Sequence, residues 1–117
     1  MKSLLAAMFM VVSLAVSGLG LAQSEEAAHL KQAREHVDAA LMAGQKGDAK
    51  GVAQHAKAAL EHVQMAQKIK PLPDLEKATK SLEETISLGK AGDAAKATEH
   101  AKESMEYIDA ANAGLGG

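Results

Sequence analysis

Hydrophobic residues recur at every third or fourth position between residues 24 and 112, and no stretch alternates strictly between apolar and polar side chains. This spacing is typical of amphipathic helices. Residues that favour helix N-termini stand at Ser24, Asp48, Asp74 and Asp93. Glycines that favour helix ends stand at Gly44, Gly89 and Gly114. The pattern predicts an all-α protein with helices near residues 25–43, 48–69, 74–88 and 93–112.

The connections between these helices predict how they are arranged. Residues 44–47 and 89–92 form equally short turns, so each helix pair should fold back on itself. Residues 71–73 contain two prolines and break the chain between the pairs. A shift of 45 residues aligns His55 with His100 and much of the surrounding sequence. We therefore predict an up-down-up-down antiparallel four-helix bundle made of two repeated helical hairpins, at about residues 24–69 and 74–112.

A heptad frame assigns one face of each predicted helix to the core. Its a and d positions predict the core residues Leu30, Ala33, Val37, Ala40, Ala56, Ala59, Val63, Ala66, Leu75, Ala78, Leu82, Thr85, Ala97, Ala101, Ser104, Ile108 and Ala111. The e positions widen this face with Leu41, Leu60, Ile86 and Met105. Most core side chains are small, so we expect burial to stabilise the fold by only about 3 to 5 kcal/mol.

The first 22 residues have the features of a secretory signal peptide. Lys2 gives a positive start, a long apolar run follows, and small residues end at Ala22. We expect cleavage after Ala22, which leaves residues 23–117 as an exported four-helix bundle without stable membrane insertion. The alternative is that the apolar run stays in place as a membrane anchor.

Composition excludes several classes of protein. The chain has no cysteine, which rules out a lipoprotein anchor, a disulfide framework and a thiolate metal site. Without residues 1–22 its net charge would be about −3, and basic and acidic residues are interspersed. No positive stripe could follow a phosphate backbone, so we expect no nucleic-acid partner. We expect the protein to be a monomer.

The histidines occupy one regular position beside the predicted core. All five fall at heptad position g: His29, His36, His55, His62 and His100. The stretches 29–37 and 55–63 share the pattern H-x-K-x-A-x-E-H-V. In an antiparallel hairpin, residues whose numbers have the same sum face each other, so His29 should face His62 and His36 should face His55. Each pair could hold a metal ion between two imidazole nitrogens.

Further candidate ligands stand near the outer pair, His29 and His62. Glu25 and Glu26 lie four and three residues before His29, and Met65 lies three residues after His62. His100 is a weaker candidate, because Ser81 stands where its facing imidazole would be. Imidazole, carboxylate and thioether ligands suit divalent ions whose affinity peaks at copper. We expect Cu(II) first, with Ni(II) or Zn(II) as alternatives.

Other functions receive less support from the sequence. No set of residues suggests nucleophilic catalysis, so we expect no enzyme. The motif formed by Glu26 and His29 has no second copy, as a di-iron centre would need. The alternative to metal binding is a metal-free helical interaction module that binds a partner helix or a membrane surface.

The histidine repeats resemble those of the small metal-binding protein family of bacterial periplasms. Members of that family are short, cysteine-free, histidine-rich helical bundles with repeats of the kind H-A-K-x-A-x-x-H. The matching stretches here are residues 29–37, residues 55–63 and a partial copy at residues 100–107. The resemblance implies a periplasmic four-helix bundle that binds several divalent ions, copper foremost. This chain has fewer histidines than such a family suggests, because Asp74, Ser81 and Tyr107 replace them in the second hairpin.

Overall fold

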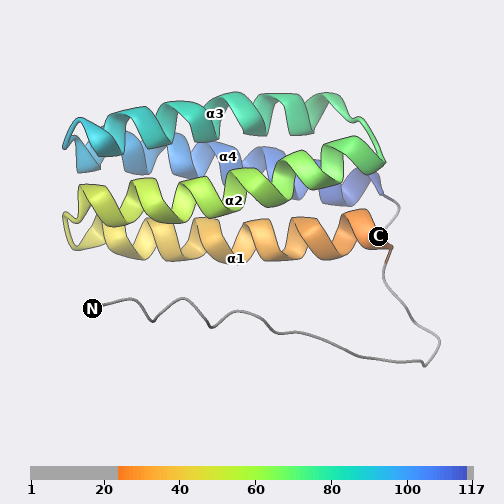
Figure 1. Ribbon diagram of the computed structural model, residues 1–117, viewed down its shortest axis with the longest axis horizontal. Coiled ribbons are helices and arrows are strands. Elements are labelled where there is room, and N and C mark those ends of the chain that lie inside the picture. The colour runs from red at the N-terminus through yellow and green to blue at the C-terminus, as the bar shows by residue number, and fades with distance from the viewer. Residues whose placement is uncertain (1–23, 116–117) are drawn as a thin grey trace, which may run out of the picture.

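The computed structural model describes residues 24–115, which form four helices and no strand. The helices are α1 (Glu25–Gln45), α2 (Ala49–Ile69), α3 (Pro73–Lys90) and α4 (Ala94–Gly114). They lie side by side, and the turns α1–α2 and α3–α4 are at the same end (Figure 1). The all-helical bundle predicted from the sequence is confirmed. The expected signal peptide, residues 1–22, lies outside the described residues.

Three helices begin at the predicted capping residues. The side chains of Ser24, Asp48 and Asp93 each accept a hydrogen bond from a backbone N–H in the first turn of the helix that follows. The prediction for Asp74 is wrong, since α3 begins at Pro73 and Leu72 precedes it without a side-chain cap. Proline suits the first helical position because it fixes φ and lacks only an N–H that would have no partner there.

The predicted ends of α1 and α3 are also displaced. Both helices run past Gly44 and Gly89, and the chain turns instead at Gly47 (φ 75°) and Gly92 (φ 89°). Gly44 and Gly89 are sites of close helix contact. A Cβ atom at Gly44 would overlap Thr98 of α4, and one at Gly89 would lie 2.7 Å from the carbonyl oxygen of Ala49.

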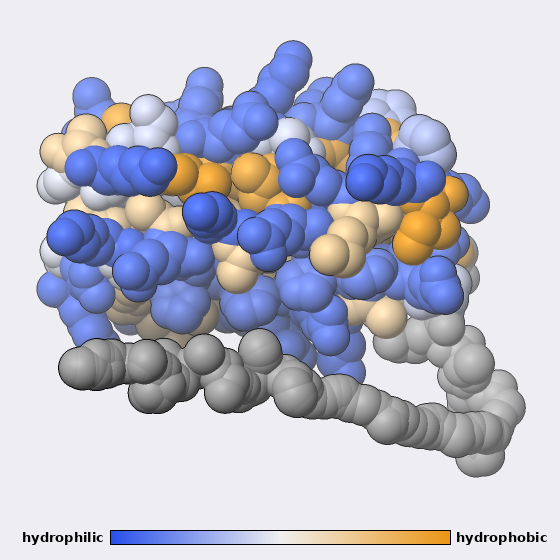
Figure 2. Space-filling view, in the orientation of Figure 1, coloured by the Kyte–Doolittle hydropathy of each residue, from blue (hydrophilic) through white to orange (hydrophobic). Residues whose placement is uncertain are grey.

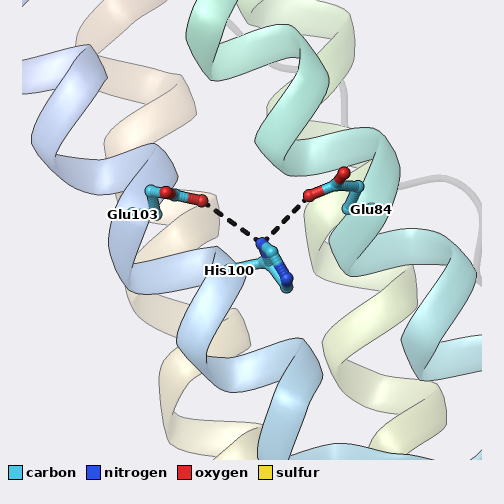
Figure 3. Close-up of side chains that lie close together, drawn as sticks. All are labelled: Glu84, His100 and Glu103. Carbon is cyan, nitrogen blue, oxygen red and sulfur yellow. Dashed lines mark hydrogen bonds and ion pairs between the residues drawn. The ribbon is translucent and has the colours of Figure 1, made fainter.

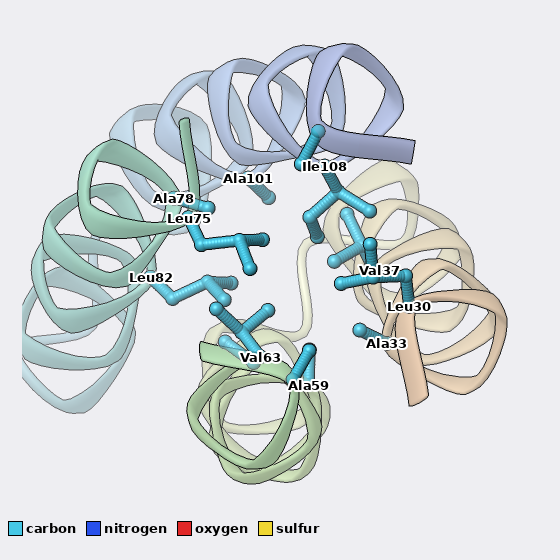
Figure 4. Packing of buried hydrophobic residues seen from close by; sticks show 13 residues of the cluster. Leu30, Ala33, Val37, Ala59, Val63, Leu75, Ala78, Leu82, Ala101 and Ile108 are labelled. Carbon is cyan, nitrogen blue, oxygen red and sulfur yellow. The ribbon is translucent and has the colours of Figure 1, made fainter. Parts of the chain in front are cut away.

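The core lies between the four helices, with its side chains directed inwards from all of them (Figure 4). Every predicted a and d residue is buried, and the four predicted e residues pack partly buried against this core. Burial extends further at the end of the molecule that carries the α1–α2 and α3–α4 turns, where Gly51, Val52 and Ala53 are also buried. Most of the buried hydrophobic residues are alanines, which lets the helices approach closely.

The visible surface is mostly hydrophilic, with a few hydrophobic side chains between polar ones (Figure 2). Arg34 of α1 and Asp109 of α4 form an exposed ion pair at 2.8 Å. None of the described helices is both long enough and apolar enough to cross a membrane.

Candidate functional site

Two pairs of imidazole rings meet along the contact between α1 and α2. His29 and His36 lie on α1, and His55 and His62 lie on α2. The Nδ1 atoms of His29 and His62 are 3.2 Å apart. The ring centroids of His36 and His55 are 6.5 Å apart, with an angle of 26° between the rings. The residues that were expected to face each other therefore do so, and the outer pair is in closer contact.

A third contact joins these pairs into one row of imidazoles, which we call the histidine row. The ring centroid of His62 is 5.5 Å from that of His29 and 5.6 Å from that of His36. The expectation of two separate pairs misses this contact. Side chains on a helix lean towards its N-terminus, so in helices that run in opposite directions His36 and His62 lean towards each other.

The histidine row lies at the edge of the core. Each of its members directly precedes a buried residue in the sequence, and all four are half-buried. Burial lowers the pKa of His62 below its usual 6.5, and the nearby His29 and His36 lower it further. This lower pKa favours the neutral form of His62, which is the form that can bind a metal ion.

The carboxylates expected near the outer pair do not form a compact ligand group with it. Among residues 24–115, no third imidazole or carboxylate forms a compact ligand group with His29 and His62. Glu25 is exposed and Glu26 is half-buried at the start of α1. Met65 is 44% exposed and lines an open depression of about 610 Å³ with residues of α3. The roles of Glu25, Glu26 and Met65 as ligands stay predictions.

A second cluster lies between α3 and α4. Nδ1 of His100 is 3.1 Å from Oε1 of Glu84 and 3.2 Å from Oε1 of Glu103. Figure 3 shows both carboxylates reaching the same ring nitrogen, Glu84 from α3 and Glu103 from α4. The hydroxyl of Ser81, which is 5% exposed, donates a hydrogen bond to the same oxygen of Glu103 at 3.1 Å.

Sequence reasoning identified His100 and Ser81 but missed the two glutamates. Glu103 follows His100 by three residues, a spacing that places both on one face of α4. Glu84 likewise follows Ser81 by three residues on α3. Glutamate is long enough to span one helical turn, so a search one turn away from His100 and Ser81 would have included both glutamates as candidates. Their spacing alone does not show that they reach the ring of His100.

Both clusters have the chemistry and spacing of metal ligands. Imidazole nitrogen and carboxylate oxygen are common ligands of divalent transition ions. Two such atoms, each about 2.1 Å from one ion, lie about 3.0 to 3.4 Å apart at octahedral or tetrahedral angles. The separations of 3.1 and 3.2 Å found in these clusters fall in this range. An ion could therefore bind without a large rearrangement of the helices.

Comparison with known proteins agrees with this chemistry. No curated protein matches the chain. The family model described as small metal-binding protein matches residues 1–111. Because this match covers nearly the whole sequence, the chain belongs to the small metal-binding protein family.

Proposed function

We propose that this protein binds divalent metal ions in the periplasm, copper first and nickel or zinc next, and so buffers, sequesters or detoxifies them. The observation that carries the proposal is the 3.2 Å contact between the Nδ1 atoms of His29 and His62. Two neutral imidazoles at this distance can share one ion across α1 and α2. We assign the protein a binding role without an enzymatic reaction.

The histidine row favours copper among the candidate ions. Its ligands are imidazole nitrogens, for which affinity increases along the first-row divalent ions to a maximum at Cu(II). Burial lowers the pKa of His62 and so favours its neutral form, which reduces the competition between protons and the metal ion. His36 and His55 extend the row and offer a second, looser position, since their ring centroids are 6.5 Å apart.

The proposed scaffold is an up-down-up-down bundle of two repeated hairpins. Two turns lie at one end of the molecule and the α2–α3 connection lies at the other (Figure 1). A shift of 45 residues maps Gly44 onto Gly89 and Ala53 onto Thr98. A Cβ atom at Gly44 would meet Thr98, and one at Gly89 would meet Ala53, so equivalent positions make equivalent contacts. This correspondence supports the repeat.

The periplasmic location rests on the sequence of residues 1–22. Their positive start, apolar run and small residues before position 23 are those of a cleaved signal peptide. Mass spectrometry of the protein from a periplasmic extract tests this part of the proposal. A mass that includes Lys2 would contradict cleavage and favour a retained anchor.

Isothermal titration calorimetry of the purified protein with Cu(II), Ni(II) and Zn(II) tests metal binding at the histidine row. Zinc is diamagnetic, so NMR can follow the ring resonances of His29 and His62 directly. We expect copper to bind most tightly and zinc to shift both sets of resonances. If no ion binds, metal binding is refuted and the metal-free interaction module becomes the better hypothesis. If an ion binds but these resonances do not respond, the assignment of the site to the histidine row is wrong.

A further inference from the structure

We propose that Glu84, His100 and Glu103 form a second metal site, separate from the histidine row, which takes a divalent ion that accepts both nitrogen and oxygen ligands, such as Zn(II). The proposed function places metal at α1 and α2 only. This site lies between α3 and α4 and adds two carboxylate ligands that the sequence alone did not indicate.

The three potential ligand atoms lie close enough together to share one ion. One oxygen of each glutamate and Nδ1 of His100 lie within 4.8 Å of one another. The two distances to Nδ1, 3.1 and 3.2 Å, match those between neighbouring ligands of one bound ion. The dashed lines in Figure 3 converge from two helices on a single nitrogen. Zinc commonly takes three protein ligands and a water molecule, so this set is sufficient.

The charges of the cluster also favour a cation. Two carboxylates contact a ring nitrogen that can carry only one hydrogen, so this nitrogen has one donor for two acceptors. Within residues 24–115, neither Glu84 nor Glu103 forms an ion pair with a lysine or an arginine. A divalent ion would interact with both carboxylates at once and neutralise their combined charge.

Ser81 holds one ligand in place. Its hydroxyl is buried and donates to Oε1 of Glu103, the oxygen that also contacts His100. An ordered partner behind a ligating carboxylate is typical of metal sites, because it fixes the orientation of the ligand. The cluster is therefore partly organised before any ion binds.

Alignment of the two halves of the chain shows how the sites differ. A shift of 45 residues maps Glu84 onto Ala39 and Glu103 onto Ala58, while His100 maps onto His55. The second half thus has carboxylates at two positions where the first half has alanine. Carboxylates suit harder ions than imidazoles do, so the second site should discriminate less strongly in favour of copper than the histidine row.

Calorimetry and NMR with Zn(II) on the full chain test this site. The background variant carries H29N, H36N, H55N and H62N, which removes the histidine row. We expect it to bind one zinc ion and to show a shift of the His100 ring resonances. Adding E84Q and E103Q should weaken this binding at least tenfold. The matched control adds E83Q and E106Q, which change the charge equally at exposed positions outside the cluster, and should bind as the background does.

Two results would overturn the second site: unchanged His100 resonances at saturating zinc, or equal affinities of the E84Q/E103Q variant and its control. Circular dichroism of each variant shows whether it is folded. In the unmodified chain, the ring resonances of His100 report on the second site and those of His29 report on the histidine row. A response at His100 alone would refute metal binding at the histidine row and keep this site, whereas a response at His29 alone would do the reverse.

Discussion

The contact between His29 and His62 predicts a large and specific stabilisation by copper. An ion that binds only the folded protein stabilises it by about 2.7 kcal/mol at a hundredfold excess over its Kd. For a bundle of about 90 residues this corresponds to an increase in melting temperature of roughly 10 to 20 °C. Because the two Nδ1 atoms are already 3.2 Å apart, rearrangement of the ligands should weaken the affinity little, so a low copper concentration should be enough to reach this excess.

Replacing both residues, His29→Asn and His62→Asn, should remove at least half of this increase. The remaining pair, His36 and His55, has ring centroids 6.5 Å apart and makes a poorer site. Circular dichroism at 222 nm, recorded with and without Cu(II), gives the melting temperatures. The rings of His29 and His62 are only half-buried, so the metal-free melting temperature should change by a few degrees at most.

Two controls make this experiment specific to the outer pair. The H36N/H55N variant loses the same number of imidazoles but keeps the closest nitrogen contact, so it should retain more of the copper effect. The H100N variant leaves the whole histidine row intact and should retain nearly all of the effect on this hairpin. Equal copper-induced shifts in the H29N/H62N variant and the parent would refute the argument from geometry.

Three further predictions concern the metal-free protein. Because the pKa of His62 is lowered in the folded state, this side chain binds protons more readily in the unfolded state. The free energy of unfolding measured in urea should therefore fall as pH drops below about 6.5, and the H62N variant should show a weaker pH dependence. Gly89→Ala should destabilise the protein by about 1 to 3 kcal/mol in urea unfolding, because the added Cβ would overlap the backbone of α2. Gly114→Ala is the control, since a Cβ there has no neighbouring atom within 4 Å and should change the free energy of unfolding little. Asp93→Ala should destabilise the protein by about 1 kcal/mol in thermal unfolding, because it removes the side chain that caps α4. Asp74→Ala should cost less, because Asp74 is not the N-cap of α3, and equal losses would contradict the observed start of α3.

The sequence predicts the core and most helix starts because these depend on local spacing. Burial follows the heptad pattern, and capping by Ser24 or Asp48 depends on residues three positions apart. The displaced helix ends have another cause. Gly44 and Gly89 look like terminators in the sequence, but their lack of a side chain is required by helices far away in the chain. Such contacts depend on how the two hairpins pack against each other, and local sequence patterns carry no information about that packing.

The candidate sites show the same limit. Counting residues from a turn predicts that His29 faces His62, because backbone register fixes this relation. It does not predict the contact of His36 with His62, which depends on the lean of side chains along the helices. Glu84 was missed for a related reason, since its reach across one turn of α3 depends on the rotamer of a long side chain. Register can be read from sequence, whereas side-chain reach cannot.

The two ends of the bundle are closed by different means. At the end with the α1–α2 and α3–α4 turns, the lack of a side chain at Gly44 and Gly89 lets the helices pack closely against Thr98 and Ala53. His29 and His62 lie near the opposite end, 33 residues apart along the chain. Fraying should therefore begin beside these histidines, and amide hydrogen exchange should be fastest there in the absence of metal. A bound ion would cross-link α1 and α2 at this end, so local amide exchange should slow as the concentration of the metal ion rises.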